Sequence, residues 1–438
     1  MKVAIAGAGW AGWAAAVQAT QLGHTAVVFE ASRVLGGRAR GLDGTLPDGA
    51  AVKLDNGQHI LIGAYTETLS LMRGVGIDPD QALLRLPLTL KFPDGTGLQF
   101  PRWPPPFNAL GGILTAQGWS LPDKLSLLQI AAHWRLAGFA CAASQSVAQL
   151  CETLRPQVMR SLIEPLCVSA LNTPADRASG QVFLRVMRDS LFAGAGSSDL
   201  LLPRVDLSAL FPTAAARWFE QQGGQLRMGT RVDEVSPSAG QTRWQVNGEN
   251  FDAVILALPS TEAARIAGRI DQSAGWPLTA ATLRFEAITT VYAWGAKAAL
   301  PHPMLALHSQ PGEPSSAPAQ FAFDRGQLGG PRGLLAFVVS ASTDERGTAQ
   351  AQVLQQAKNQ LGLNLQGVQT IVEKRATFAC TPGLQRPPME IAPGLLACGD
   401  YVDGPYPATL EGAVRSGMAA AHALTLESPT PAAPNQRP

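Results

Sequence analysis

The chain has 438 residues, more than one compact core usually contains, so two domains are expected. Apolar residues make up 46% of the chain and charged residues 15%, which favours a large buried interior and excludes extensive disorder. The formal net charge of +1 gives no reason to expect a nucleic acid or a strongly acidic partner.

The chain opens with a short apolar run, residues 3–6, that is suited to a strand buried on both faces. Three glycines follow, and each allows something that a side chain would prevent. Gly7 allows a tight turn, Gly9 lets the backbone approach a pyrophosphate, and Gly12 lets the next helix, expected at 11–22, pack closely on the sheet. The positive end of that helix would face the phosphates. A glycine turn alone is weak evidence, because such turns occur in many α/β proteins.

A second apolar run, 26–30, ends in Glu30, which lies 18 residues after Gly12. A carboxylate at this place can accept hydrogen bonds from ribose hydroxyls and would repel a 2′-phosphate. Four residues beyond Glu30-Ala31 comes a second glycine turn that ends in Gly37 and Arg38. This spacing resembles the extended fingerprint of two-dinucleotide-binding flavoproteins. By that resemblance Arg38 lies near the pyrophosphate of FAD, and FAD is favoured over a nicotinamide cofactor.

The segment 54–65 carries four polar side chains, Asp55, Asn56, Gln58 and His59, between apolar residues. One interpretation is a turn at Asn56-Gly57 with a structural histidine. The other comes from similar flavin oxidoreductases, in which this segment returns toward the isoalloxazine ring. Its polar groups would then face the flavin or the substrate.

The stretch 66–199 is expected to be mostly helical. A helix at 66–74 precedes strands near 88–91 and 97–100, and a longer helix runs over 121–143 with an apolar stripe. That stripe is either core or an apolar surface through which a lipid enters or on which a bilayer rests. Helical segments follow at 147–175, broken at Pro156 and Pro165, and at 181–192, and the next helix is capped near Asp206 or Ser208.

The next part, 210–258, resembles the second βα segment of a flavoprotein. A helix at 210–222 is followed by a strand pair at 225–235, short strands, and a buried strand that ends near 258. In that interpretation the backbone at Val232 pairs with the adenine edge. Residues 260–370 then alternate as an antiparallel sheet with a helix at 348–361, typical of a substrate domain.

Near the C-terminus an apolar strand, 394–398, ends in Gly399 and Asp400, and a helix begins near Thr409. Asp400 can hold a ribityl or phosphate-linked hydroxyl, and the N–H groups at the start of the helix can face the pyrimidine edge of the flavin. The helix residues predicted to bind the cofactor are Leu410, Glu411 and Ala413. The tail, 427–438, is predicted to be disordered.

These patterns predict an α/β fold with a Rossmann-like FAD-binding domain of the two-dinucleotide-binding flavoprotein type and an α+β substrate domain. The FAD-binding domain is discontinuous, over 1–65, 200–260 and 370–425, and the substrate domain takes 66–199 and 261–369.

The five cysteines show neither CxxC nor metal-ligand spacing, so no metal site is expected and free thiols in a reducing compartment are favoured. The chain starts directly with a strand, without a visible signal peptide. Its most apolar long stretch, 125–143, is interrupted by Gln129, His133 and Arg135, which argues against a transmembrane helix. A cytoplasmic protein is expected, and contact with a membrane surface stays open.

The motifs converge on one family. The chain resembles the hydroxysqualene dehydroxylases, squalene-associated FAD-dependent members of the phytoene desaturase and flavin amine oxidase superfamily. Segments that span nearly the whole chain carry the resemblance: 7–12, 55–65, 165–174, 185–191, 201–207 and 406–417. One departure is Trp13, where relatives tend to carry a smaller aliphatic residue, and it should affect helix packing more than function.

The resemblance implies reductive removal of the hydroxyl group of hydroxysqualene to give squalene, in bacterial hopanoid biosynthesis, with an electron donor that the sequence does not identify. The allylic hydroxyl would leave as water after protonation, a hydride from reduced FAD would reach the carbon, and the site must be dry. Candidate acids are His59, Asp189 and Tyr406, and His59 is preferred because its ordinary pKa lies near working pH.

Three other interpretations remain open. A carotenoid-type desaturase would run the flavin in the opposite direction. A flavin amine oxidase would usually need an aromatic cage, which the count of four tyrosines disfavours. A non-enzymatic module that carries flavin, lipid or a partner protein would not need the polar segment around His59.

Overall fold

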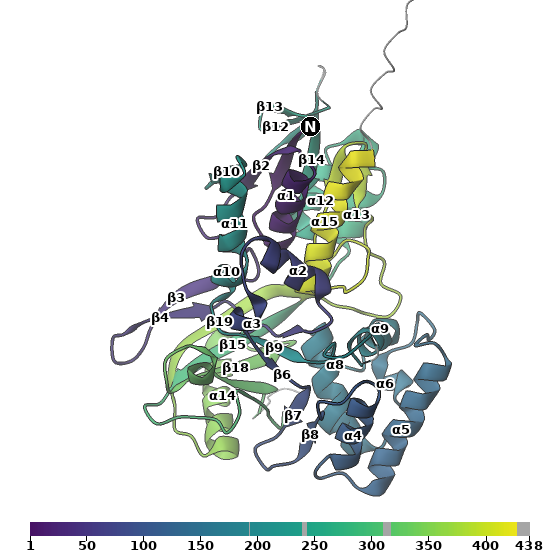
Figure 1. Ribbon diagram of the computed structural model, residues 1–438, viewed down its shortest axis with the longest axis vertical. Helices are drawn as coiled ribbons and strands as arrows, with labels where there is room; N and C mark the ends of the chain where they lie inside the picture. Colours follow the sequence, from purple (N-terminus) through teal and green to yellow (C-terminus); the bar gives the residue numbers. More distant parts are fainter. Residues whose placement is uncertain (192, 239–242, 310–316, 427–438) are drawn as a thin grey trace, which may run out of the picture.

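The computed structural model describes residues 1–191, 193–238, 243–309 and 317–426 (Figure 1). The predicted tail, 427–438, and Phe192 at the end of a predicted helix lie outside the described residues. A parallel sheet with its helices forms one end of the molecule. An antiparallel sheet and a group of helices form the other end (Figure 1).

The parallel sheet contains strands from three distant parts of the chain, in the order β10-β2-β1-β14-β21-β20. The first five strands are parallel, and β20 is antiparallel to β21. The strands in chain order are β1 (Lys2–Ala6), β2 (Thr25–Glu30), β10 (Gln225–Met228), β14 (Ala253–Leu256), β20 (Glu390–Ala392) and β21 (Leu395–Ala397). Buried apolar runs form the central strands because helices cover both faces of such a sheet.

Helix α1 (Trp10–Gln21) packs between α11 (Pro212–Gln221) and α15 (Leu410–Leu426). The alanine-rich face of α1 allows close contact with α15, where a Cβ on Gly417 would lie 2.2 Å from the carbonyl oxygen of Ala11. Trp13 is fully buried, and its ring meets Phe219 of α11 edge-on at 5.8 Å. The unusual tryptophan therefore fills the space between two helices, as a packing role requires.

One predicted element is wrong. The segment 225–235 does not form a strand pair, because β10 joins the parallel sheet and pairs with β2. The next strand, β11 (Val235–Pro237), belongs to a separate antiparallel sheet with β12 (Trp244–Val246) and β13 (Glu249–Phe251). Local alternation cannot reveal which partner a short strand will find.

The antiparallel sheet has the order β16-β17-β18-β15-β19 and is backed by helix α14 (Arg346–Leu361). Its strands in chain order are β15 (Phe285–Trp294), β16 (Met304–Ala306), β17 (Phe321–Asp324), β18 (Leu334–Ser340) and β19 (Gln366–Phe378). This is the antiparallel sheet plus helix that the sequence predicts for residues 260–370.

Helices from the middle of the chain lie beside this sheet (Figure 1). They are α4 (Phe107–Thr115), α5 (Leu121–Leu136), α6 (Val147–Leu150), α7 (Pro156–Val158), α8 (Glu164–Leu171) and α9 (Gly180–Leu191). The long helix ends at Leu136, earlier than predicted. A π-helical turn, Met159–Ile163, connects α7 to α8, so Pro165 stands near the start of α8 and does not interrupt the helical path.

Short elements connect the two ends. The strands are β3 (Gly41–Thr45), β4 (Ala51–Asp55), β5 (Leu61–Ile62), β6 (Leu83–Leu86), β7 (Thr89–Lys91), β8 (Gly97–Gln99) and β9 (Leu200–Pro203). The helices are α2 (Thr66–Gly74), α3 (Pro79–Ala82), α10 (Leu207–Leu210), α12 (Ser260–Ala267) and α13 (Trp276–Ala281), with 3₁₀ turns at Asp271–Ser273 and Arg325–Leu328. The side chain of Asp206 caps α10 by accepting hydrogen bonds from the N–H groups of Ser208 and Ala209, as predicted.

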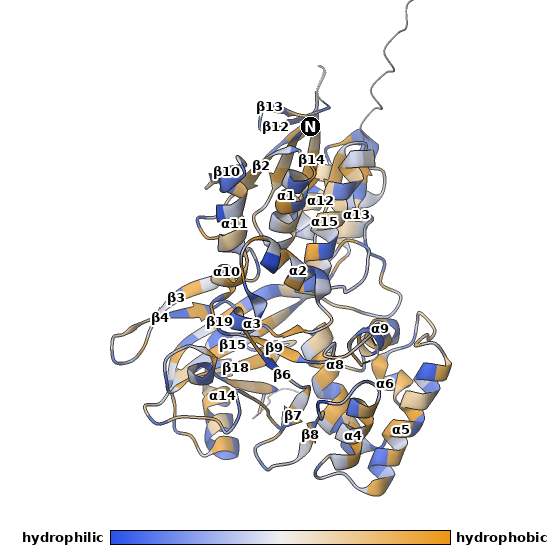
Figure 2. Ribbon diagram, viewed as in Figure 1, coloured by the Kyte–Doolittle hydropathy of each residue, from blue (hydrophilic) through white to orange (hydrophobic). Residues whose placement is uncertain are grey.

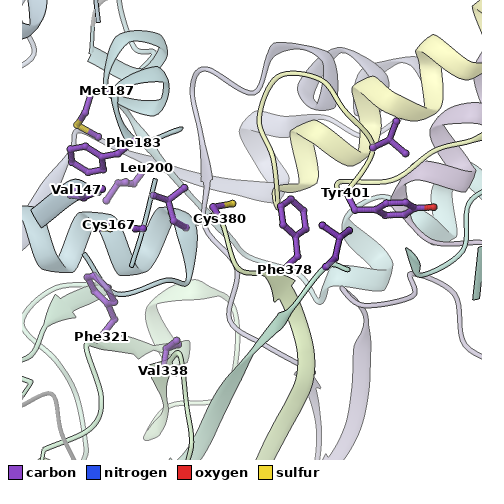
Figure 3. Packing of buried hydrophobic residues seen from close by; sticks show 14 of the residues in the cluster. Val147, Cys167, Phe183, Met187, Leu200, Phe321, Val338, Phe378, Cys380 and Tyr401 are labelled. Carbon is purple, nitrogen blue, oxygen red and sulfur yellow. The ribbon is translucent and has the colours of Figure 1, made fainter. Parts of the chain in front are cut away.

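One apolar core extends across both ends of the molecule (Figure 3). Figure 3 shows Phe183 of α9 and Cys167 of α8 on one side, Phe321 of β17 beneath them, and Phe378 of β19 with Tyr401 on the other side. The predicted fold class, an α/β flavoprotein-type fold with an α+β second part, is confirmed. The domain boundaries stay a prediction.

Candidate active site

A continuous cavity of about 950 Å³ runs from the parallel sheet to the helices α4 and α5. The carboxyl ends of β1, β2, β14 and β21 open into one end of it. The residues that follow them, among them Gly7, Ala257 and Gly399, line the cavity with Glu30 at the end of β2. Ligands of open α/β sheets bind at this edge, where loops from neighbouring strands meet.

The two glycine turns present bare backbone to the cavity. Gly7 has a φ of +109°, and a Cβ there would lie 2.5 Å from the carbonyl oxygen of Ala257. A Cβ on Gly12 would lie 1.9 Å from the carbonyl oxygen of Gly7. The second turn lies against the first, since the N–H of Gly36 donates to the carbonyl of Ala8 at 3.0 Å. A Cβ on Gly37 would lie 3.3 Å from the Cα of Gly9, so the two turns lie close together with no side chain between them. Bare backbone of this kind fits a pyrophosphate.

Glu30 stands where the sequence predicts it. Its carboxylate accepts the N–H of Ala8 at 2.8 Å and the N–H of Ser32 at 2.7 Å, so both oxygens are held at the edge of the cavity. A fixed carboxylate beside the glycine turn can accept hydrogen bonds from ribose hydroxyls.

Arg38 and Asp400 join the two ends of the chain. Their side chains form an ion pair in the wall of the cavity, and Nη1 of Arg38 also donates to the carbonyl of Ala376 at 3.1 Å. Burial alone would lower the pKa of Arg38, but the charge and hydrogen bonds of Asp400 outweigh burial and raise it. The guanidinium is therefore a permanent cation beside the bare backbone of the glycine turns, as an anionic pyrophosphate requires.

Other predicted cofactor residues divide into two groups. Val232, Leu410 and Ala413 line the cavity. The carboxylate of Glu411 is fully buried away from it and accepts hydrogen bonds from the N–H and hydroxyl of Thr68 at 2.9 and 2.6 Å. Glu411 thus ties α15 to the start of α2, and only its backbone N–H remains for the predicted contact with the flavin.

The first turn of α15 also limits the predicted donors. The N–H of Ala413 donates to the carbonyl of Thr409 at 3.0 Å, and the N–H of Gly412 donates to the hydroxyl of Thr409 at 3.0 Å. The N–H groups of Leu410 and Glu411 lie at helix positions that have no intrahelical acceptor. These two are the stronger candidates for a contact with the cofactor, and Ala413 would contribute its small side chain to the wall.

Most of the polar side chains in the segment 55–59 are structural. Asp55 accepts the N–H of Leu207 at 2.7 Å, and Asn56 accepts the N–H of Arg40 at 2.9 Å. Gln58 accepts a hydrogen bond from Arg325 at 3.1 Å. Burial raises the pKa of Asp55 to about 6, although Leu207 and Arg325 oppose the shift. Asn56 and Gln58 also line the cavity beside His59, whereas Asp55 does not. The structural interpretation therefore describes Asp55 fully, and His59 is the residue of this segment whose free ring nitrogen is available to a ligand.

His59 lines the cavity, and its Nδ1 lies 2.8 Å from the carbonyl oxygen of Gly57. Because a carbonyl only accepts, Nδ1 carries the proton and Nε2 is left as the acceptor nitrogen of the neutral ring. Burial lowers the pKa of His59 below its ordinary value, so the ring is mostly neutral at neutral pH. Arg38 and Glu373 are near enough to contribute to this pKa, which puts His59 beside the predicted cofactor site.

Asp189 and Tyr406 are brought together at another part of the cavity wall. Burial would raise the pKa of Asp189, but hydrogen bonds from Arg185 at 2.7 Å and Arg188 at 2.9 Å outweigh it and lower the pKa. Burial raises the pKa of Tyr406, and Asp189 adds to that rise. At neutral pH Asp189 is therefore an anion, and Tyr406 keeps its proton.

Sequence reasoning missed Glu373. This residue of β19 lines the cavity and accepts a hydrogen bond from the side-chain amide of Asn56 at 3.3 Å. Its neighbours Lys374 and Arg375 are exposed, so nothing local distinguishes Glu373 from a surface carboxylate. Only the pairing of β19 with β15 turns it toward the site.

The far end of the cavity is apolar. Its wall comes from four helices and the antiparallel sheet, including Ile113 of α4, Leu127 and Trp134 of α5, Leu166 of α8, Met187 of α9 and Phe323 of β17. Such a wall offers apolar contact to a long hydrocarbon chain and excludes water. The rings of Tyr65 and Tyr406 meet edge-on at 6.2 Å, so they do not form the facing pair that an aromatic cage needs.

All five cysteines are free thiols, in agreement with the sequence. Within the described ranges, no helix is long and apolar enough to cross a bilayer.

The backbone cradle at the edge of the parallel sheet opens into a cavity with an apolar end, an arrangement that fits an FAD-dependent oxidoreductase. Sequence comparison leads to the same class. The chain belongs to the family of flavin containing amine oxidoreductases, whose profile matches residues 10–425. The predicted cofactor, FAD, and the predicted enzyme class are confirmed.

Among curated proteins, the chain is 25% identical to hydroxysqualene dehydroxylase of Sinorhizobium fredii over 98% of this chain and 99% of that protein. It is 27% identical to hydroxysqualene dehydroxylase of Rhodopseudomonas palustris over 96% and 97% of the two chains. The predicted resemblance is thus confirmed. A 15-cis-phytoene desaturase of Synechococcus elongatus matches only 26% of this chain and 24% of its own, at 33% identity.

Among solved structures, an oxidoreductase from Methanosarcina mazei has a TM-score of 0.73 and 15% identity, with 96% of this chain and all of that chain covered. At that identity the likeness speaks for the fold alone.

Proposed function

We propose that this protein removes the hydroxyl group of hydroxysqualene reductively to give squalene, in hopanoid or related isoprenoid biosynthesis. The observation that carries the proposal is the continuity of the cofactor cradle with an apolar space, because a hydride must reach a carbon of a long hydrocarbon without water beside it. The near full-length relatives that bear this name support the choice of substrate.

Reduced FAD supplies the hydride in this reaction. The substrate loses its C–O bond and gains a C–H bond, and the hydroxyl leaves as water with one added proton. The chain must therefore orient the allylic hydroxyl, deliver a proton to its oxygen, and keep water from the allylic carbon. The apolar wall around Leu166, Met187 and Phe323 performs the last task.

His59 is our first candidate for the proton donor. In its neutral form Nε2 can accept a hydrogen bond from the substrate hydroxyl and so orient the oxygen. Once protonated, an imidazolium with a lowered pKa is a stronger acid than an ordinary histidine. It can then hold a proton at Nε2, next to the oxygen that must leave.

Asp189 and Tyr406 would act differently from His59. An ionised Asp189 cannot donate a proton, but its charge favours positive charge that develops on a nearby carbon. The hydroxyl of Tyr406 hydrogen-bonds to Asp189, so it must turn from that carboxylate to donate to the leaving oxygen, and its raised pKa makes full proton transfer harder.

The rival functions have weaker support. The edge-on tyrosine pair does not favour an amine oxidase, and the carotenoid desaturase match covers a quarter of the chain. A non-enzymatic carrier would not need ionisable groups such as His59 and Asp189 in the wall of an apolar cavity.

The test is anaerobic incubation of the reduced holoenzyme with hydroxysqualene, followed by product analysis and by the flavin spectrum. We expect squalene and reoxidised flavin in equal amounts. Oxidised enzyme with phytoene is the control for a desaturase. No squalene, or reduction of the flavin by phytoene, would sink the specific assignment and leave the flavoprotein class intact.

The role of His59 has its own test. If His59 donates the proton, single-turnover rates rise as the pH falls through its pKa, which lies below 6.5, and His59→Phe abolishes that rise. The variant must keep its flavin for the comparison to hold. Wild-type rates in His59→Phe would remove His59 from the mechanism, and the same measurement on Tyr406→Phe would then examine the second candidate.

A further inference from the structure

The helices α4 and α5, which lie at the end of the molecule opposite the parallel sheet (Figure 1), carry an unusual number of exposed apolar side chains. Of the twelve large hydrophobic residues that are exposed in the described ranges, seven come from one stretch of 34 residues. We call this stretch the α4–α5 surface. It consists of Trp103, Phe107, Leu110, Leu114, Leu121, Leu125 and Leu136.

The helices of this surface are apolar on two sides. In α4, Phe107, Leu110 and Leu114 are exposed, while Ile113 lines the cavity. In α5, Leu121 is 67% exposed, and Trp134 lines the cavity. Orange segments on both helices in Figure 2 show this composition. A soluble helix normally keeps one polar side, so the outer side of α4 and α5 needs an apolar cover.

The charges around this surface indicate which kind of partner can bind to it. Arg102 and Arg135 are exposed at its edge, and Lys124 is half-buried there, with its Nζ donating to the carbonyl of Leu114 at 2.8 Å. The single acid between residues 101 and 140 is Asp123, which caps α5 and pairs with Arg155 at 3.1 Å. Cationic side chains around exposed leucine and aromatic residues match an anionic lipid surface, whose headgroups attract the cations while the apolar side chains enter the acyl region.

A second groove lies beside α4, and its lining also favours an anionic lipid surface as the partner. This groove of about 870 Å³ is lined by Lys91, Arg102, Trp103 and His302. Leu98 of β8 lines both this groove and the main cavity, so little more than one strand separates them. The cations Lys91 and Arg102, with Trp103 in the same wall, can hold lipid phosphates next to the apolar cavity.

We propose that the α4–α5 surface docks the protein on a bilayer that contains anionic phospholipid, and that the apolar substrate passes from the bilayer between α4 and α5 into the cavity. The docking stands on the exposed side chains and charges alone, whereas the passage of substrate rests on the proposed function. The two helices then form a thin apolar wall with lipid on one side and the cavity on the other.

The docking is tested by co-sedimentation of the holoenzyme with vesicles of phosphatidylcholine, with and without phosphatidylglycerol. We expect binding to the anionic vesicles, and a loss of about tenfold or more in Leu121→Ser/Leu125→Ser. Leu278→Ser is the matched control, because Leu278 is 75% exposed on α13 at the other end of the molecule. Equal binding by wild type and double variant, or an equal loss in the control, would overturn the proposal.

The charges are tested with Arg102→Gln/Arg135→Gln, which should weaken binding to anionic vesicles several-fold and leave binding to neutral vesicles unchanged. The oligomeric state of the wild type and of the double serine variant is measured alongside. A wild-type oligomer that the serine variant breaks, without vesicle binding, would mean that a second copy covers the surface and would overturn the proposal.

Substrate passage is tested by comparing kcat/KM for hydroxysqualene in anionic vesicles and in detergent micelles. The double serine variant should lose about tenfold in vesicles and nothing in micelles, with unchanged flavin content. Equal activity in both media would overturn the passage. Vesicle binding without any dehydroxylation would instead reject the proposed function and keep the docking, so the two failures are distinguishable.

Discussion

The walls at the two ends of the cavity differ in composition. At the parallel sheet the wall is backbone: two glycine turns, the loop after β14 and the start of α15, with Glu30 and Arg38 as the main side chains. At the helical end the wall is side chains from four helices and a sheet, with no contiguous motif. The fit of a ligand at the sheet end depends on backbone conformation, and its fit at the helical end depends on the volume that the side chains leave open.

This difference determines what each end tolerates. A backbone wall fails when a single Cβ is added, because main-chain atoms cannot move aside. A side-chain wall changes gradually, because each residue contributes only part of the apolar surface. The expected effects of substitutions therefore decrease from the cradle to the apolar end of the cavity.

The largest effect is expected for Gly12→Ala. The added Cβ would lie 1.9 Å from the carbonyl oxygen of Gly7, so the first turn cannot keep its shape. We expect loss of bound flavin, measured as flavin absorbance per protein after purification. Gly74→Ala is the control, since nothing lies within 4 Å of its Cβ position. Normal flavin content in Gly12→Ala would contradict the backbone account of this end.

The next effect is expected for Arg38→Met, which leaves Asp400 as a buried carboxylate without its partner. Loss of one partner of a buried pair costs about 3 kcal/mol, and the anionic pyrophosphate loses its cation as well. Denaturant unfolding of the apoprotein and flavin affinity measure the two effects, and Arg38→Lys should restore part of both. Lys53→Met breaks an exposed pair with Asp43 and should leave the unfolding midpoint unchanged.

Asp55, in the segment that connects the two ends, should make the folding stability depend on pH. The pKa of Asp55 is raised to about 6 in the folded protein and is ordinary in the unfolded chain, so the folded state holds the proton more tightly. The stability of the wild type relative to Asp55→Asn should therefore fall by up to about 3 kcal/mol as pH rises from about 4 to about 7.

Urea unfolding of both proteins across this range measures that difference. Asp48→Asn in an exposed turn is the control and should show no such slope. A constant difference between the wild type and Asp55→Asn would show that burial of Asp55 does not govern its titration.

The smallest effect is expected at the apolar end. Ala131→Phe adds a ring to the cavity wall on α5, while Ala132→Phe adds the same ring on the exposed side of that helix. We expect kcat/KM for hydroxysqualene in detergent to fall about tenfold in the first variant and to stay unchanged in the second, with normal flavin in both. Equal activity of the two variants would show that the substrate does not occupy this part of the cavity.

Particular residues show how far sequence reasoning reached. Gly7, Gly9, Glu30 and Arg38 line the cavity, and Gly12 packs directly behind Gly7, because local turns and elements fix these residues relative to one another within 40 residues. Glu411 was predicted beside the same cofactor, yet its carboxylate ties α15 to α2. A helix start is visible in a sequence, but the direction of its side chains depends on what packs against it.

The sequence by itself determined the parallel sheet at the N-terminus and the dinucleotide cradle, since local backbone geometry and regular spacing carry that information. The choice of FAD came from the resemblance of the Glu30 to Arg38 segment to the flavoprotein fingerprint. Tertiary structure decided the rest. It paired Arg38 with Asp400 across 362 residues, turned Glu373 toward the site, ionised Asp189 through two arginines, and joined the cradle to the apolar space. These features depend on contacts between distant segments and on burial, and no local pattern records either of them.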